Sequence, residues 1–150
     1  MASIVIHGFP GSTYVQIVRL VLSHKAVDYE FRDLETEMNT SVHRELHPFE
    51  YVPILQQGDF TLYETSAIVG YIDDAFPQPR LTPTSMRERA KMNQWISAVN
   101  SYYYPQIVFH LSHERNVFPA LGIEPDERVV QVALPKIERA LDVMERELTA

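Results

Sequence analysis

A short turn rich in glycine, proline and hydroxyl side chains is the first place where this sequence can do chemistry: Gly8-Phe9-Pro10-Gly11-Ser12-Thr13-Tyr14. The apolar run Ile4 to Ile6 precedes it and a pattern of helical period follows it, so the turn joins a predicted strand to a predicted helix. Backbone N–H groups and the helix dipole at such a turn favour an anion, whether a phosphate, a carboxylate or a thiolate. The alternative is that Ser12 and Thr13 only cap the helix.

A second candidate is Tyr51-Val52-Pro53, directly before another predicted strand. A proline can open a strand for structural reasons alone. If the Val52–Pro53 bond is cis, however, the Val52 backbone can offer both its N–H and its C=O to an extended ligand, as an added strand would.

A third candidate, Leu62-Tyr63-Glu64-Thr65-Ser66-Ala67-Ile68, places a carboxylate and a hydroxyl at the next strand-to-helix turn. There Glu64 can meet the ammonium group of a ligand, while the Thr65 hydroxyl and N–H meet its carboxylate. Helix capping is again the alternative.

The last candidate is an aromatic cluster, Ser101-Tyr102-Tyr103-Tyr104-Pro105, with Phe109 and His110 one to two turns later. Aromatic side chains at helical spacing usually belong to a core. Three consecutive tyrosines cannot all face one core, so we expect some of them to line a surface or a cleft.

The sequence gives little support to a metal site, a hydrolase site or a nucleotide-binding site. His110 and His113 lie three residues apart, but the zinc-protease order His-Glu-x-x-His and an evident third ligand are missing, so no metal is expected. The sequence also lacks the Gly-x-Ser-x-Gly pattern of hydrolases, the Gly-x-Gly-x-x-Gly pattern and the P-loop pattern.

The amino-acid composition excludes several classes of partner and of mechanism. The 150 residues hold 13 Lys and Arg against 20 Asp and Glu, a net charge of -7, which argues against a nucleic-acid partner. There is no cysteine, so disulfides, thiolate metal sites and mechanisms with a protein thiol are excluded. No apolar run reaches membrane-spanning length and the first residues do not resemble a signal peptide, so we expect a cytoplasmic protein without a membrane partner.

The elements that position these residues follow from the hydrophobic period. Up to about Phe76 the apolar residues follow in turn the spacing of strands and the spacing of helices, in the order β-α-β-α-β-β-α. The pattern predicts a strand over Ile4–Ile6, a helix with a capping box at Thr13 and Gln16, a strand over Asp28–Asp33, a helix over Thr40–Leu46, a hairpin of Pro53–Gln56 and Phe60–Tyr63, and a helix over Thr65–Ala75.

Beyond the proline-rich residues 77–83 the period is helical only. Ser85 and Glu88 form a capping box, Pro105 predicts a kink or a break, and residues 116–124 predict a loop. Pro125 is expected at the first position of a final helix. We expect its apolar stripe to face inward: Val130, Leu134, Ile137, Leu141, Met144 and Leu148.

Together these segments resemble the glutathione transferase superfamily, most of all its phi-like and bacterial serine-type members. The resemblance covers almost the whole chain and rests on the Pro-Gly-Ser-Thr turn, on His47-Pro48-Phe49-Glu50-Tyr51-Val52-Pro53-Ile54 and on residues 62–68, with Gln94-Trp95 and Pro125-Asp126-Glu127 at the expected distances. It implies an α/β plus all-α architecture: a thioredoxin-like glutathione-binding domain over 1–78, a linker over 79–84 and a partial helical domain over 85–150.

The resemblance also implies the residues that bind glutathione: Ser12, Thr13, Val52, Pro53, Glu64 and Thr65. Ser12 would be catalytic, donating a hydrogen bond to the glutathione sulfur and stabilising its thiolate. Val52 would hold the cysteinyl backbone, with Pro53 cis, while Glu64 and Thr65 would bind the γ-glutamyl amino and carboxylate groups. Tyr51 stands where Gln or Lys is usual, so the glycine carboxylate is left with His43 and His47 as weak candidates.

For the second substrate the resemblance implies a pocket for a small hydrophobic electrophile, walled by Tyr102, Tyr103, Phe109 and His110. Phe49 matches an aromatic residue that many members insert into a partner subunit, which implies a homodimer. The expected function is therefore detoxifying conjugation of glutathione, without a metal. The alternative is a non-catalytic module of the same fold that binds ligands or mediates assembly.

The end of the chain is the largest departure from the family, whose members usually run some 50 to 70 residues further. The final predicted helix is apolar on more than one side. We therefore expect a chain severed from a longer one, or a partner chain that covers the exposed stripe.

Overall fold

The computed structural model describes residues 2–149 and divides into two compact units, one ending at Pro83 and one starting at Thr84. The first unit has the predicted β-α-β-α-β-β-α order. Its elements are β1 (Ile4–Gly8), α1 (Thr13–His24), β2 (Tyr29–Asp33), α2 (Ser41–Leu46), β3 (Ile54–Gln57), β4 (Phe60–Tyr63) and α3 (Thr65–Ala75).

The four strands form one mixed sheet in the order β2-β1-β3-β4. β1 runs parallel to β2 and antiparallel to β3, and β3 runs antiparallel to β4. The register pairs His7 with Ile54 and Ile54 with Tyr63. As a result, the C-terminal ends of β1 and β4 and the N-terminal end of β3 share one edge of the sheet.

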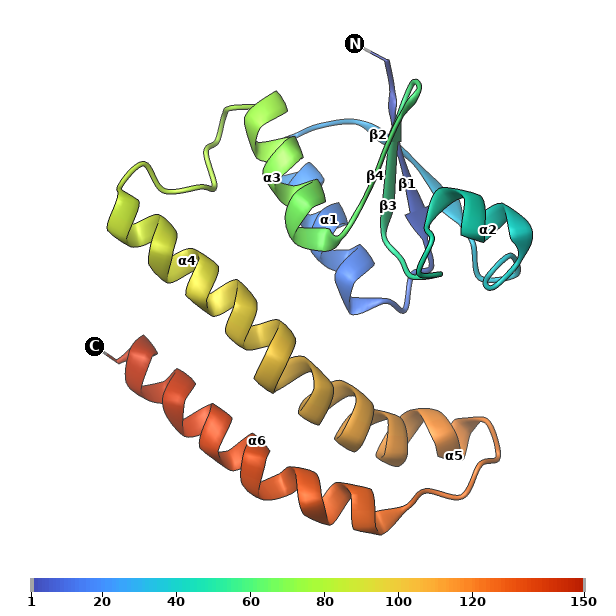
Figure 1. Cartoon of the computed structure of the whole chain (residues 1–150), viewed down its shortest axis with the longest axis vertical. Helices are drawn as coiled ribbons and strands as arrows, with labels where there is room; N and C mark the ends of the chain where they lie inside the picture. Colours follow the sequence, from blue (N-terminus) through green and yellow to red (C-terminus); the bar gives the residue numbers. More distant parts are fainter. Residues whose placement is uncertain (1, 150) are drawn as a thin grey trace. The chain divides into compact units, whose positions relative to one another are not determined.

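Helices cover both faces of this sheet: α1 and α3 lie on one side and α2 on the other (Figure 1). Successive strand residues point to opposite faces, so Ile4 and Ile6 enter the core beneath α1 and α3 while His7 faces away from it. That core consists of Ile4, Ile6, Val18, Leu22, Leu55, Ile68 and Ile72, all at most 2% exposed.

The helix α1 packs more closely on β1 than the sequence pattern indicates. A Cβ atom at Gly8 would collide with the Val15 side chain, so only glycine lets α1 pack this tightly on the strand. The helix cap also differs from the predicted box: Ser12 is the N-cap, and the Gln16 amide donates to the Pro10 carbonyl at 2.6 Å instead of reaching back to Thr13.

The segment after α3 is anchored to the first unit by a buried ion pair. Lys25 Nζ lies 2.7 Å from Asp73 Oδ1 and also donates to the carbonyls of Phe76 and Pro79. The Asp73 carboxylate in turn accepts from two backbone N–H groups of residues 81 and 82. The unit boundary therefore falls after Pro83, within the expected linker 79–84.

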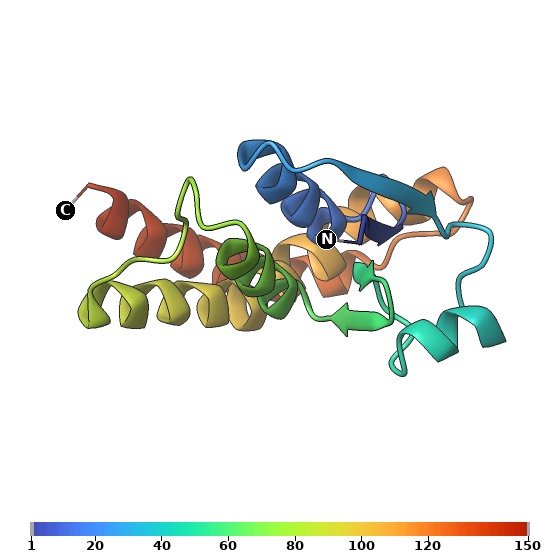
Figure 2. The same cartoon turned by 90° about the horizontal axis from the view of Figure 1, so that it is seen from above.

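The second unit is entirely helical. It contains α4 (Met86–Ala98), two π-helical stretches, η1 (Val99–Tyr103) and η2 (Pro105–Val117), the single turn α5 (Phe118–Ala120) and α6 (Glu127–Leu148). The long helix that begins with α4 and the helix α6 run antiparallel, joined by the loop after α5 (Figure 2).

Two predictions for this unit were wrong in detail, and a third had left two outcomes open. Of the kink or break expected at Pro105, the break does not occur: the chain stays helical there, and the stretches on both sides of Tyr104 have the wider turns of a π-helix. The helix also continues through Ala120, inside the predicted loop 116–124. α6 begins at Glu127 with Asp126 as its N-cap, two residues after Pro125.

α6 buries two residues of the expected apolar stripe, Val130 and Ile137, together with two alanines. Its buried residues are Val130, Ala133, Ile137 and Ala140, whereas Leu141 and Leu148 of the expected stripe are exposed. Because the alanine side chains are small, the neighbouring helix can approach the α6 backbone closely. The Tyr103 hydroxyl donates a hydrogen bond to the Ala140 carbonyl at 2.7 Å. In residues 2–149 no helix combines the length and the apolar character needed to cross a membrane.

Candidate active site

The strand register brings three of the predicted segments to one edge of the sheet. Ser12 follows β1, Val52 precedes β3, and Glu64 follows β4, and these three strand ends are neighbours in the sheet. Because α1 and α3 also pack against each other, their N-terminal ends lie at that same edge. The site therefore combines two helix N-termini with one stretch of exposed backbone.

Ser12 caps α1 and keeps its hydroxyl proton available. Its Oγ accepts from the Val15 N–H at 3.4 Å, and its own N–H donates to the Phe9 carbonyl at 3.1 Å. A hydroxyl that accepts one hydrogen bond can still donate another. The capping role and the ligand-binding role are therefore compatible, and the half-buried Ser12 side chain can serve both.

Val52 presents an unpaired stretch of backbone. The Val52–Pro53 peptide bond is cis, as the resemblance implied. Neither the N–H nor the C=O of Val52 forms a hydrogen bond with any other residue of the range 2–149. Both groups of a half-buried residue are thus left to pair with an extended ligand, in the manner of strand addition.

Glu64 does not cap α3, although it occupies the N-cap position. Its side chain makes no capping hydrogen bond, and its backbone has φ 70° and ψ 116°. The N–H groups of Thr65 and Ser66 likewise have no partner in the described part of the chain. The α3 N-terminus therefore retains free donors for an anion, with the exposed Glu64 carboxylate beside them.

His43 and His47, the weak candidates for the glycine carboxylate, are both unsuited to that task. His43 is fully buried and both of its ring nitrogens contact backbone groups. His47 is 2% exposed and stacks on Tyr63 with ring centroids 4.5 Å apart. Burial lowers the pKa of His47, more than the nearby Glu64 carboxylate raises it, and His43 lowers it further. A neutral, buried imidazole is a poor partner for a carboxylate.

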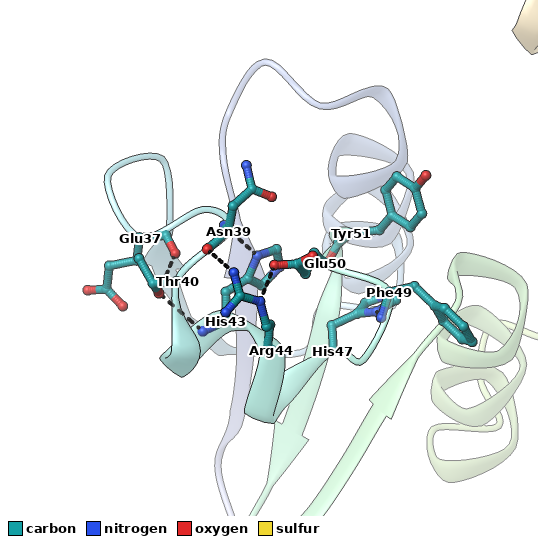
Figure 3. A network of polar contacts seen from close by, with 9 residues as sticks. All are labelled: Glu37, Asn39, Thr40, His43, Arg44, His47, Phe49, Glu50 and Tyr51. Carbon is teal, nitrogen blue, oxygen red and sulfur yellow. Dashed lines mark hydrogen bonds and ion pairs between the residues drawn. The ribbon is translucent and has the colours of Figure 1, made fainter.

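These histidines belong to a network that surrounds α2 (Figure 3). Arg44 donates to the Glu50 carboxylate at 2.6 Å and to the Asn39 carbonyl at 2.9 Å. Phe49, the expected subunit contact, is 63% exposed beside the rings of His47 and Tyr63. The network connects the loop before α2 to the loop that leads to Val52.

The four residues expected to bind an electrophile do not share one environment within the second unit. Tyr103 is 6% exposed, with its ring near Trp95 and its hydroxyl on α6, so it contributes to packing. Tyr102 is exposed and borders a groove of about 660 Å³ between the helices of this unit. Phe109 contacts the Tyr104 and His113 rings, and His110 Nδ1 lies 3.1 Å from the Gln106 side-chain oxygen.

Two other features of the described residues bear on the site. No three His, Asp or Glu side chains among residues 2–149 are grouped so that they can hold a metal ion. A cavity of about 610 Å³ in the first unit, lined by Ile4, Lys25 and Gln57 among others, lies at the opposite edge of the sheet. The unpartnered N–H groups of Val52, Thr65 and Ser66 lie instead at the edge of the sheet where Ser12 is found, called the Ser12 edge below.

The sequence did not reveal two features of this site. The positive φ of Glu64 has no local marker, since glycine or asparagine is the usual residue in such a conformation. The unpaired backbone of Val52 depends on which strand lies beside it, and that is decided by sheet register.

Comparisons with known proteins point to a single family. A family model described as "Glutathione S-transferase, N-terminal domain" matches residues 6–80. Glutathione S-transferase 3 of Zea mays is 31% identical, in an alignment covering 99% of this chain and 68% of that protein. The chain spans 59% to 73% of the length of the curated relatives it matches.

Solved structures show the same similarity. Glutathione transferase F2 from Populus trichocarpa superposes with a TM-score of 0.88 at 25% identity, covering 97% of this chain and 70% of that one. Glutathione S-transferase-I bound with lactoylglutathione superposes with a TM-score of 0.85 at 27% identity, covering 99% of this chain and 72% of that one.

Proposed function

Because the chain belongs to the glutathione transferase superfamily, we propose that it binds glutathione at the Ser12 edge of the sheet and conjugates its sulfur to a small hydrophobic electrophile. The single observation that supports this best is the unpaired Val52 backbone beside two helix N-termini. Glutathione is an extended peptide with a carboxylate and an ammonium group at one end and a thiol in the middle, and these features match the groups present.

Each part of the ligand has a partner in this proposal. The cysteinyl backbone pairs with the N–H and C=O of Val52, beside Pro53. The γ-glutamyl carboxylate is bound by the Thr65 N–H and hydroxyl at the α3 N-terminus, and its ammonium group by Glu64. The sulfur lies at the α1 N-terminus, near Thr13, and accepts a hydrogen bond from Ser12.

The Ser12 hydroxyl activates the thiol without removing its proton. A thiol of pKa about 8.5 is about 3% ionised at neutral pH. If the hydroxyl and the helix dipole lower that pKa by about 2 units, the thiolate fraction rises about 25-fold, while intrinsic nucleophilicity falls about 8-fold. The net gain is only about threefold, so most of the acceleration must come from holding the electrophile beside an oriented sulfur.

For that electrophile we propose side chains of the helical unit: Tyr102, Phe109 and His110, with Tyr103 supporting them from the packed side. Alanine substitutions here should change the KM for the electrophile and leave glutathione affinity unchanged. We also propose a homodimer that uses Phe49, and a cytoplasmic, detoxifying role.

The decisive experiment compares Ser12→Gly with the unmodified chain. Glycine removes the hydroxyl but remains a tolerable N-cap, costing only a few tenths of a kcal/mol. We expect turnover of a model aryl halide to fall tenfold or more, because thiolate stabilisation and sulfur orientation are both lost. Glutathione affinity, measured by calorimetry, should stay within about twofold.

Ser12→Thr is the matched control, because it keeps the hydroxyl and the cap, and it should retain most of the turnover. Undiminished turnover in Ser12→Gly would refute the activating role. Glutathione binding without turnover in the unmodified chain would instead favour the alternative, a non-catalytic binding module.

A further inference from the structure

His43 connects the loop before α2 to the backbone that the proposed ligand would use. It is fully buried on α2. On one side the Asn39 N–H donates to its Nδ1 at 3.2 Å, and on the other its Nε2 lies 3.0 Å from the Tyr51 carbonyl oxygen (Figure 3). The ring is therefore a rigid bridge between two loops that are 12 residues apart in the sequence.

The two partners assign the proton on this ring. An amide N–H only donates and a carbonyl oxygen only accepts. Nδ1 must then be the unprotonated acceptor, and Nε2 must carry the proton that it donates to Tyr51. His43 is accordingly the neutral Nε2–H tautomer, with no nitrogen left to contact a ligand.

The bond to Tyr51 also determines the direction of the next amide. The C=O of Tyr51 and the N–H of Val52 belong to one planar peptide group, in which they point in opposite directions. Holding that carbonyl toward His43 therefore turns the Val52 N–H away from α2. A hydrogen bond accepted at the carbonyl also polarises the N–H of the same peptide group, which makes it a stronger donor.

We propose that His43 is a positioning residue for glutathione binding: its Nε2–H holds the Tyr51–Val52 peptide group so that the Val52 N–H is presented to the ligand. This rests on the proposed function, because it takes the ligand at Val52 to be glutathione. His43 does not touch the ligand. It acts through the Tyr51–Val52 peptide group, whose N–H has no partner in the range 2–149.

The neighbouring ion pair cannot replace this bond. Arg44 and Glu50 join the same two loops at 2.6 Å, but their side chains are 58% and 34% exposed. An exposed ion pair holds its partners weakly and leaves their backbone free to move. Glu50 is also one residue further from Val52 than Tyr51 is. Arg44 is therefore a suitable control, since it lies next to His43 in the same network.

Two variants of His43 separate its two hydrogen bonds. The amide of glutamine lies about where Nε2 lies in histidine, so His43→Gln keeps a donor for the Tyr51 carbonyl. The amide of asparagine lies about where Nδ1 lies, so His43→Asn keeps an acceptor for the Asn39 N–H and loses the bond to Tyr51. Each variant removes one hydrogen bond and the aromatic ring, and asparagine is one methylene smaller than glutamine.

We expect the Kd of glutathione, measured by calorimetry on the full chain well below the unfolding temperature, to rise about tenfold in His43→Asn and at most about twofold in His43→Gln. In turnover assays the KM for glutathione should follow the same order, while the KM for the aryl halide and kcat change little. Arg44→Gln should leave all four constants within about twofold.

Equal affinities in the two variants, alongside normal binding by the unmodified chain, would overturn the role of His43 and leave the proposed function intact. An unmodified chain that does not bind glutathione would overturn the proposed function, and this inference with it. Nitrogen NMR of the unmodified chain tests the bridge without any variant: an Nε2–H tautomer at His43 supports it, and an Nδ1–H tautomer refutes it.

Discussion

At the scale of single residues, the most informative position is Glu64. A residue with a Cβ atom held at φ 70° and ψ 116° costs about 1–3 kcal/mol, and the surrounding structure must impose that conformation. Glu64 gains no capping bond in return. Strain that is maintained without a structural benefit is typical of binding sites, which supports a ligand role for its carboxylate.

Replacing Glu64 by glycine should therefore separate stability from binding. We expect Glu64→Gly to raise the free energy of unfolding by about 1 kcal/mol, because glycine adopts this conformation without strain. The same variant should bind glutathione at least tenfold more weakly, since the ammonium group loses its partner. Urea denaturation and calorimetry measure the two effects.

Glu64→Ala is the control, because it removes the carboxylate but keeps the Cβ atom and its strain. It should lose affinity as Glu64→Gly does, without the gain in stability. If both variants bound glutathione as tightly as the unmodified chain, Glu64 would have no role in binding. If Glu64→Gly did not raise the free energy of unfolding, the backbone at Glu64 would not be strained.

At the scale of elements, the Lys25–Asp73 ion pair joins the end of α1, the end of α3 and the segment that follows. Both side chains are almost completely buried. Burial alone would raise the pKa of Asp73. Hydrogen bonds from Lys25 and from the N–H groups of Leu81 and Thr82 outweigh it and hold that pKa well below its usual range. The charged form is thus the one that the fold stabilises.

This shift predicts an acid-sensitive unit. A carboxyl whose pKa is lower in the folded than in the unfolded chain stabilises the fold fully above the unfolded value, about 3.9. The contribution is lost as the pH falls below that value toward the folded pKa. We expect stability in urea to decrease between about pH 5 and pH 2, and Asp73→Asn to flatten this decrease.

At pH 7 the Asp73→Asn variant should be less stable by about 3–5 kcal/mol, because Lys25 remains buried without its counter-charge. Asp74→Asn is the control, since Asp74 is the exposed neighbour on the same helix. It should leave both the stability at pH 7 and the slope in acid unchanged. If the stability of Asp73→Asn still decreased steeply in acid, other carboxyl groups would be responsible for the acid sensitivity.

At the scale of the whole molecule, the chain consists of two units with different ways of burying apolar surface. The first has a core between one face of a sheet and the helices α1 and α3, whereas in the second α6 buries two alanines with Val130 and Ile137 and leaves several large residues exposed. Phe49 adds an exposed ring to the first unit. Large exposed side chains on both units are consistent with association of the chain.

We expect the purified protein to have twice the mass of its 17.3 kDa chain by light scattering. Phe49→Ser should shift it toward the monomer, because the aromatic ring is the proposed anchor in the partner subunit. Leu20→Ser removes a comparably exposed apolar side chain from the first unit and should leave the mass unchanged. A monomeric unmodified chain would contradict the proposed dimer.

The order of elements in the first unit and the turns that carry Ser12, Val52 and Glu64 can be predicted from the sequence. Those features are local: the hydrophobic period distinguishes strands from helices, and Gly, Pro and hydroxyl residues end them. The same local signals misplaced the ends of helices in the second unit, where the expected loop 116–124 is helical as far as Ala120 and the final helix begins at Glu127 rather than at Pro125.

How those turns lie relative to one another depends on long-range pairing, which the sequence pattern does not show. The pairing of His7 with Ile54 and of Ile54 with Tyr63 brings the three turns to one edge of the sheet. The ring of His43 connects Asn39 to Tyr51. In the sequence His43 is only one of six histidines. Its role depends on partners supplied by two separate loops, and such long-range pairings leave no trace in local periodicity.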